Sequence, residues 1–127
     1  MSTRAGSEGL DARELSQDQW GPFFEEINRR IENEADIEAS LEIVSPDIVG
    51  PAAEHLPLDS ITYEDGDDEI AIGLGGRGER FPAALWHFVT EPRQVWIMER
   101  DGELGVIAIQ SADGTRTLLH LEGAGAL

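Results

Sequence analysis

The segment Pro92–Leu121, PRQVWIMERDGELGVIAIQSADGTRTLLHL, contains three apolar runs separated by two turn signals. Tight turns are predicted at Asp101-Gly102 and Asp113-Gly114, because glycine takes the positive φ that a short hairpin requires and aspartate tolerates the neighbouring geometry. Runs joined in this way predict a three-stranded antiparallel meander. The segment indicates an architecture and carries no catalytic signature.

The meander is predicted to be apolar on both faces. One face is expected to carry Val95, Ile97, Val106, Ala108, Leu119 and Leu121, and the other Trp96, Met98, Ile107, Ile109 and Leu118. A single helix covers only one face of a sheet. The second face is therefore expected to be covered by the segment Arg80–Glu91, by a proline-rich loop, or by a second subunit, so we expect a homo-oligomer, with a homodimer as its simplest form.

The principal helix is predicted within Leu15–Asn33, LSQDQWGPFFEEINRRIEN. Apolar side chains three and four residues apart define its buried face: Trp20, Phe23, Phe24, Ile27 and Ile31. The helix begins either at Ser16, with Gln19 completing a capping box, or at Pro22. The opposite face is expected to be solvated and carries Glu25, Glu26, Asn28, Arg29, Glu32 and Asn33.

The chain after this helix is predicted to form strands. Apolar and polar residues alternate along Asp36–Val44, which indicates a half-buried strand with an acidic outer face. Pro46–Pro57, PDIVGPAAEHLP, is predicted to be an ordered loop crossing the sheet edge, because proline is excluded from the interior of a sheet. A hairpin is then expected from Ile61–Glu64 and Glu69–Leu74, joined by an acidic turn.

The segment Arg80–Glu91, RFPAALWHFVTE, is predicted to be a short second helix that ends before Pro92. Together these elements predict an α+β fold. It contains an antiparallel sheet of about six strands, made of a hairpin and the meander, packed by one main N-terminal helix and a short second helix. Residues 1–12 are predicted to be a disordered arm and residues 13–127 a single domain.

The chain has 127 residues, a net charge of −17 and no cysteine, and all nine basic residues are arginine. Carboxylates spread along the chain favour a salt-adapted protein; a surface for a basic partner and a nucleic-acid mimic are the rival interpretations. Direct nucleic-acid binding is disfavoured because no basic patch exists to neutralise phosphates. With no signal peptide or membrane-spanning run, we expect a cytoplasmic protein without membrane contact.

Short motifs give weak signals for metal or nucleotide binding. An EF-hand loop beginning at Asp65 would need glycine where Ile70 stands. The string GLGGRG, Gly73–Gly78, follows a hairpin strand and lacks the helix of a dinucleotide site, so a loop is favoured. A zinc site would need His55, His87 and His120 to converge, which is disfavoured. We therefore expect no metal, no cofactor and no catalytic residue, and a non-enzymatic protein.

The alternative to a non-enzymatic protein is a small-molecule-binding protein or enzyme. Its ligand pocket is predicted between the proline-rich loop, the Gly73–Gly78 loop and Arg80–Glu91. Arg93 is the leading candidate because a guanidinium can hold an anion with two hydrogen bonds, although pairing with a carboxylate is the favoured interpretation. The full set of predicted ligand-binding residues is Tyr63, Arg77, Trp86, His87, Arg93 and Trp96.

Four motifs in this order resemble the bacterial and archaeal DUF5335 family of unknown function. They are Trp20-x-x-Phe23-Phe24, LPLDSITYE at Leu56–Glu64, PRQVWI at Pro92–Ile97 and ADGTRTLLHL at Ala112–Leu121. The resemblance covers about Leu15 to Leu121 and implies a compact single domain without an assigned reaction. We therefore expect an acidic accessory or binding protein that self-associates, with a protein partner as a further option.

Overall fold

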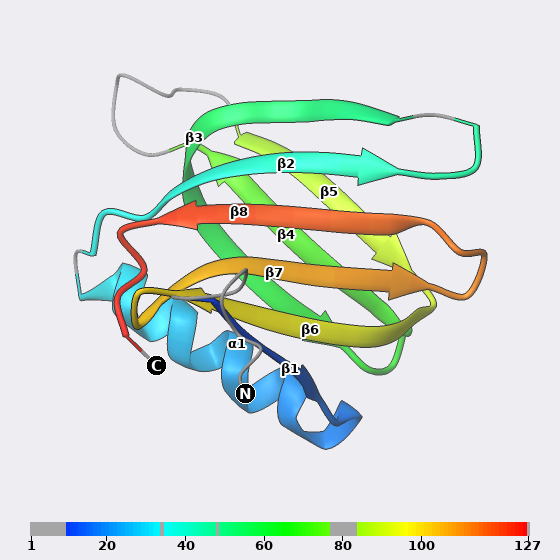
Figure 1. Cartoon of the computed structure of the whole chain (residues 1–127), viewed down its shortest axis with the longest axis horizontal. Coiled ribbons are helices and arrows are strands. Elements are labelled where there is room, and N and C mark those ends of the chain that lie inside the picture. The colour runs from blue at the N-terminus through cyan, green and yellow to red at the C-terminus, as the bar shows by residue number, and fades with distance from the viewer. Residues whose placement is uncertain (1–9, 34, 48, 77–83, 127) are drawn as a thin grey trace, which may run out of the picture.

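The computed structural model describes residues 10–33, 35–47, 49–76 and 84–126. One helix and eight strands occur in this part of the chain (Figure 1). In chain order they are β1 Leu10–Leu15, α1 Gln17–Glu32, β2 Glu38–Val44, β3 Val49–Glu64, β4 Glu69–Gly75, β5 Ala84–Thr90, β6 Pro92–Arg100, β7 Glu103–Ser111 and β8 Arg116–Glu122. The predicted α+β class and antiparallel sheet are confirmed, whereas the sheet has eight strands where about six were predicted.

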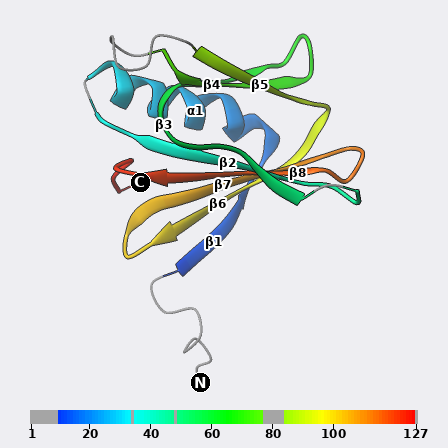
Figure 2. The same cartoon turned by 90° about the horizontal axis from the view of Figure 1, so that it is seen from above.

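All neighbouring strands are antiparallel, in the order β1-β6-β7-β8-β2-β3-β4-β5. The long strand β3 pairs with β2 as far as Pro57 and with β4 from Leu58 onward. We call the strands β1, β6, β7, β8 and β2, together with the first half of β3, the large wing. The second half of β3, with β4 and β5, is the small wing. The two wings lie on either side of α1 (Figure 2).

The core fills the space between the two wings and α1. The helix contributes the buried residues Trp20, Phe24, Ile27 and Ile31. The large wing contributes Leu15, Ala39, Leu41, Val95, Ile97, Ile107, Ile109, Leu119 and Leu121, and the small wing Leu58, Ile61, Ile70, Ile72, Leu74 and Val89. Burial of these apolar side chains, contributed by α1 and by both wings, is the main source of stability for the folded chain.

Asn28 of α1 supplies the hydrogen bonds that β3 lacks where the two wings separate. Its Nδ2 donates to the backbone oxygen of Ile61 at 2.8 Å, and its Oδ1 accepts from the backbone nitrogen of Ile61 at 2.9 Å. The side-chain amide thus pairs with β3 as another strand would. The prediction that Asn28 belongs to a solvated helix face is wrong, because this residue is half-buried and bonded to the sheet.

The helix begins after Ser16, which is the first of the two predicted starts. Gln19 accepts a hydrogen bond from the Ser16 backbone nitrogen at 2.9 Å, as in a capping box. Trp20 is buried and its Nε1 donates to the backbone oxygen of Leu15 at 3.2 Å. Pro22 lies inside the helix. The described residues contain no helix long and apolar enough to cross a membrane.

The meander is confirmed as β6, β7 and β8, with both turns at the predicted positions. Asp101 and Gly102 have φ values of 55° and 83°, the left-handed pair that a two-residue hairpin requires. The predicted faces of β7 are wrong, because the pairing shifts by one residue beside Gly105 and places Met98 opposite Val106. A one-residue bulge exchanges the two faces of a strand.

As a consequence, Ile107 and Ile109 lie in the core, opposite Ile97 and Val95. The face turned away from α1 instead carries Trp96, Met98, Val106, Ala108 and Leu118.

The proline-rich segment is a strand rather than the predicted loop. Residues 49–57 form the first half of β3 and pair with β2 on one side, while β4 pairs only with the second half. The other side of this first half is therefore an open edge, where Pro51 and Pro57 cost no ladder hydrogen bond. The left-handed residue His55 and two register shifts accompany this irregular stretch.

Two further predictions are corrected at the ends of the sheet. Residues 84–90 form the strand β5, not a second helix, because Leu85, His87 and Val89 alternate with Trp86 and Phe88 across the sheet. Residues 80–83 lie outside the described residues. β1 includes residues 10–12, which were assigned to a disordered arm; backbone pairing with β6 orders them. Residues 1–9 lie outside the described part of the chain.

Replacing Asn28 with leucine is expected to lower the free energy of unfolding by about 2 to 4 kcal/mol, because two backbone groups of Ile61 lose their partners. Urea denaturation followed by circular dichroism measures this loss. Glu25→Leu, at an exposed position of the same helix, serves as the control and should stay within about 0.5 kcal/mol. Equal stability of Asn28→Leu and the wild type would contradict the role given to Asn28.

Candidate functional site

The outer face of the large wing, turned away from α1, carries polar side chains at its β2 side. Glu38, Ser40 and Glu42 alternate outward along β2, as the sequence pattern predicts. His55 of β3 lies with its Nδ1 3.5 Å from Oε1 of Glu38, and its backbone nitrogen donates to Oγ of Ser40 at 3.0 Å. On the other side of Ser40, Nε2 of His120 lies 3.3 Å from Oε1 of Glu42.

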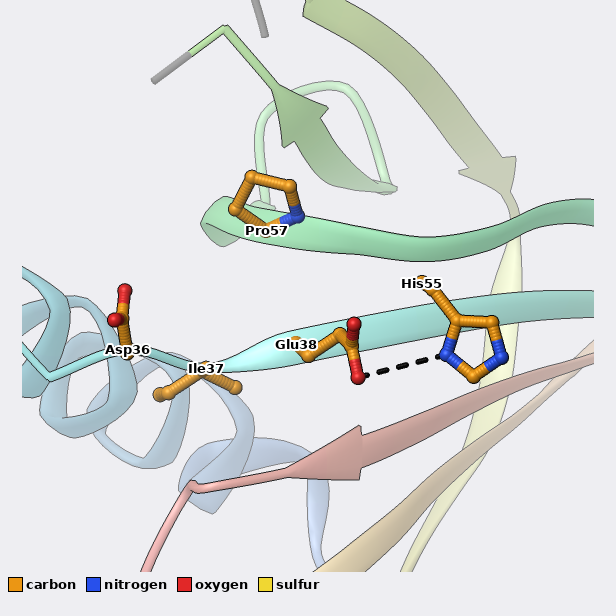
Figure 3. A pocket seen from close by; sticks show the side chains of 5 residues that line it. All are labelled: Asp36, Ile37, Glu38, His55 and Pro57. Carbon is orange, nitrogen blue, oxygen red and sulfur yellow. Dashed lines mark ion pairs between the residues drawn. The ribbon is translucent and has the colours of Figure 1, made fainter. Parts of the chain in front are cut away.

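A shallow hollow of about 250 Å³ adjoins the first of these pairs (Figure 3). Its walls are Asp36, Ile37, Glu38, His55 and Pro57. A second hollow of about 290 Å³ shares Glu38 and His55 and reaches Arg100, His120 and Glu122. The first hollow has two carboxylates, Asp36 and Glu38, and no arginine, so it suits a cation better than an anion. The second combines Glu38 and Glu122 with Arg100 and two histidines.

The two histidine–glutamate pairs are open to solvent. The side chains of His55 and Glu38 are 71% and 46% exposed, and those of His120 and Glu42 are 48% and 38% exposed. Exposed pairs contribute little to stability because water screens them. Among the described residues, no three histidine or carboxylate side chains are arranged to hold a metal ion.

Beside this polar region, the outer face of the meander is apolar. We call the five residues Trp96, Met98, Val106, Ala108 and Leu118 the outer patch. They are contiguous, because Met98 lies opposite Val106, and Trp96 and Leu118 both lie opposite Ala108. Glu14 and Glu42 flank this last row on β1 and β2. In the described chain α1 packs on the opposite face of these strands (Figure 2).

The second candidate surface is the edge strand β5. Trp86 and Phe88 share one face of β5 and are 47% and 52% exposed; we call these two residues the aromatic edge. Leu85, on the opposite face, is 41% exposed. The rings of Trp86 and Phe88 are stacked, with centroids 6.3 Å apart and an interplanar angle of 17°. Large exposed apolar side chains that gather in one place are typical of an interaction surface.

Gly73 makes room for the ring of Trp86. A Cβ atom at this position would lie 2.9 Å from two ring carbons of Trp86 and 3.2 Å from Oγ of Ser60. The absence of a side chain therefore lets the indole lie across β4. The first glycine of the string GLGGRG thus serves packing within the sheet, while residues 77 and 78 lie outside the described residues.

His87 lies on the opposite side of β5 from the stacked rings, beside the buried Ile72. Its side chain is half-buried, and burial lowers the pKa of this imidazole below its ordinary value. The neutral form is therefore favoured in the folded chain.

The predicted ligand-binding residues do not share one pocket in the described chain. Tyr63 packs edge-on against Trp20 and its hydroxyl accepts a hydrogen bond from Gln17 at 2.9 Å. Arg93 donates to Oδ2 of Asp68 at 3.2 Å, which is the carboxylate pairing favoured from the sequence.

The other predicted residues divide between two faces and two wings. Trp86 and His87 point to opposite faces of the small wing, and Trp96 belongs to the outer patch of the large wing. Arg77 lies outside the described residues.

Sequence reasoning missed the histidine–glutamate pairs, and it named Trp86 as a ligand-binding residue but missed its stacking with Phe88. The alternation of Glu38, Ser40 and Glu42 was visible, but their partners His55 and His120 come from strands whose neighbourhood depends on the strand order. The period of two in ALWHFVT was the available signal for β5.

The fold is an α+β arrangement in which one helix lies between two wings of a curled antiparallel sheet. The chain belongs to the DUF5335 family of unknown function, whose model matches residues 11–127, and this confirms the predicted resemblance. An uncharacterized protein from Aquifex aeolicus (strain VF5) is 25% identical over 116 residues, covering 91% of this chain and 96% of the relative. No solved structure matches the chain.

Replacing Gly73 with alanine is expected to displace the Trp86 ring, because the added methyl group would overlap it. The indole N–H signal of Trp86 in a proton–nitrogen NMR spectrum should shift, and stability should fall by about 1 to 3 kcal/mol. Gly66→Ala is the control, since no atom lies within 4 Å of a Cβ there. An unmoved Trp86 signal in Gly73→Ala would contradict the packing described.

The lowered pKa of His87 predicts a pH-dependent contribution to stability. The unfolded chain binds a proton more readily than the folded chain, so this contribution is present above the ordinary histidine pKa of about 6.5 and is lost as the pH falls below it. On acidification from about pH 7.5 to about pH 5.5, the wild type should lose more unfolding free energy than His87→Gln. Equal losses in urea titrations of the two proteins would show that His87 does not contribute.

Proposed function

We propose that this chain is a small acidic accessory or binding protein that self-associates through the outer patch and does not act as an enzyme. The observation that carries this proposal is the contiguous set of apolar residues on the face of the meander away from α1, of which Trp96, Met98 and Leu118 are half-buried. Apolar surface on one face of a sheet is stabilised when another layer removes it from water. A second copy of the chain supplies that layer.

The shape of the outer patch suits a sheet-on-sheet contact. Its central residues Val106 and Ala108 are short and buried, and the larger, half-buried Trp96, Met98 and Leu118 stand around them. Two sheets that pack face to face interdigitate side chains of this kind. Trp96 is the expected anchor, because tryptophan dominates the binding energy of many interfaces.

The charges around the outer patch also suit a second copy. Arg116 lies two residues from Leu118 along β8, and Arg100 borders the hollow that contains Glu38 and Glu122. Neither arginine forms an ion pair within the described residues. A symmetric dimer can therefore place arginines of one copy against carboxylates of the other at its rim.

The chain as a whole carries a net charge of −17, so two copies repel each other at low salt. Salt screens this repulsion and leaves the apolar contact in place. We accordingly place the protein in a salt-adapted cytoplasm, where an acidic, cysteine-free and lysine-free chain keeps its solubility while associating.

Sedimentation equilibrium of the purified chain is expected to show a dimer that tightens as sodium chloride rises from about 0.1 M to about 1 M. Trp96→Glu and Leu118→Glu should each give a folded monomer, because a carboxylate would be buried in the contact. Phe88→Glu, which changes an exposed aromatic residue of the small wing, serves as the control and should remain a dimer. A monomeric wild type at both salt concentrations would refute self-association.

A further inference from the structure

The edges of the sheet differ in how they are protected against pairing with another chain. The edge strand β1, LDAREL, contains charged residues, and the open side of the first half of β3 contains prolines and a left-handed residue. The second half of β3 is bonded by the amide of Asn28. Charges, prolines and covering groups are the usual means by which proteins block a strand edge.

Within the described residues, β5 has none of these protections. Residues 84–90, ALWHFVT, contain no charged residue and no proline, and they belong to the longest uncharged run of the sequence, residues 81–90. In the described chain β5 pairs with β4 on one side only. Among the described residues no strand pairs with the backbone groups of its other side, and the exposed side chains of Trp86 and Phe88 share one face of the same strand.

We propose that β5 binds an extended, basic segment of a partner protein, which adds a ninth strand to the sheet. Backbone hydrogen bonds to a free strand edge supply affinity in this mode of recognition, and alternate side chains supply specificity. Because β5 is uncharged, it does not itself favour a basic or an acidic partner segment. Selectivity for basic segments comes from the surroundings of β5.

Two features around β5 favour a basic occupant. Thr90 lies on the same face as Phe88 and pairs with Glu69, which pairs in turn with Glu64. Two carboxylates therefore lie on the face of the sheet that carries Phe88. Glu91 follows directly and is exposed. The exposed aromatic side chains Trp86 and Phe88 can contact arginine and lysine side chains, and the net charge of −17 attracts a cationic segment to the surface.

The same features disfavour a second copy of this chain as the occupant. Pairing β5 with its own copy would bring two chains that each carry a net charge of −17 together edge to edge. The outer patch lies on other strands, so β5 stays free whether or not the chain dimerises through that patch. The two proposals can therefore fail independently.

The test uses three synthetic peptides with the full-length protein at physiological ionic strength. The first alternates arginine and valine, the second has the same side chains but methylated nitrogens at alternate peptide bonds, and the third alternates glutamate and valine. Isothermal titration calorimetry measures affinity, and amide hydrogen exchange of residues 84–90 reports pairing at β5. We expect the first peptide to bind and to slow exchange in β5, and the other two to bind at least about tenfold more weakly.

Variants locate the binding site. Trp86→Ser and Phe88→Ser should each lower the affinity for the arginine–valine peptide by about tenfold or more, as expected for an aromatic anchor. Trp96→Ser, a tryptophan change on the outer patch, is the matched control and should leave this affinity unchanged even where it dissociates the dimer.

Three results would overturn the proposal. Equal binding of the methylated peptide would show that charge alone is responsible, and equal binding of the glutamate peptide would remove the preference for basic segments. A smaller oligomer in Trp86→Ser or Phe88→Ser, without peptide binding to the wild type, would assign β5 to a second copy of the chain.

Discussion

The fold depends on the change of partner along β3. As far as Pro57 this strand pairs with β2, and from Leu58 it pairs with β4 on its opposite side. Such a change leaves backbone groups without a neighbouring strand, and an unsatisfied buried group is costly. The Asn28 amide bonds to both polar groups of Ile61 and so fixes α1 to the point where the wings separate. One residue thereby links the position of the helix to the curl of the sheet.

The curl of the sheet determines which surfaces are left for partners. Because α1 and the small wing lie on the same side of the large wing, the opposite side of the meander has no described layer over it (Figure 2). The small wing ends at β5, which carries the exposed Trp86 and Phe88 on one face. An apolar face and an unprotected edge are the two kinds of surface that sheets use for association. Both follow from the same change of partner in β3.

The sequence was sufficient where local chemistry determines structure. The turns at Asp101-Gly102 and Asp113-Gly114 and the strand after Asp36 were predicted correctly, and the helix start at Ser16 was one of two predicted starts. The prediction was wrong where structure depends on distant partners. A bulge exchanged the faces of β7, an open edge admitted prolines into β3, and pairing with β4 made a strand of an apolar segment that also suits a helix. The histidine–glutamate pairs required the strand order, which no local pattern contains.

The distribution of charge connects the two proposed surfaces. Arg29 and Arg30 pair with Glu26, and Arg93 pairs with Asp68, so these cations neutralise neighbouring carboxylates. The acidic remainder of the surface repels other copies of this chain and other acidic proteins. Residues 81–90 and 104–112 are the two longest uncharged runs of the sequence; the first includes β5, and the second contributes Val106 and Ala108 to the outer patch. In this strongly acidic chain, the two surfaces proposed to bind partners are therefore those with the fewest charged residues. The charged residues around each surface favour a second copy at the outer patch and a basic segment at β5.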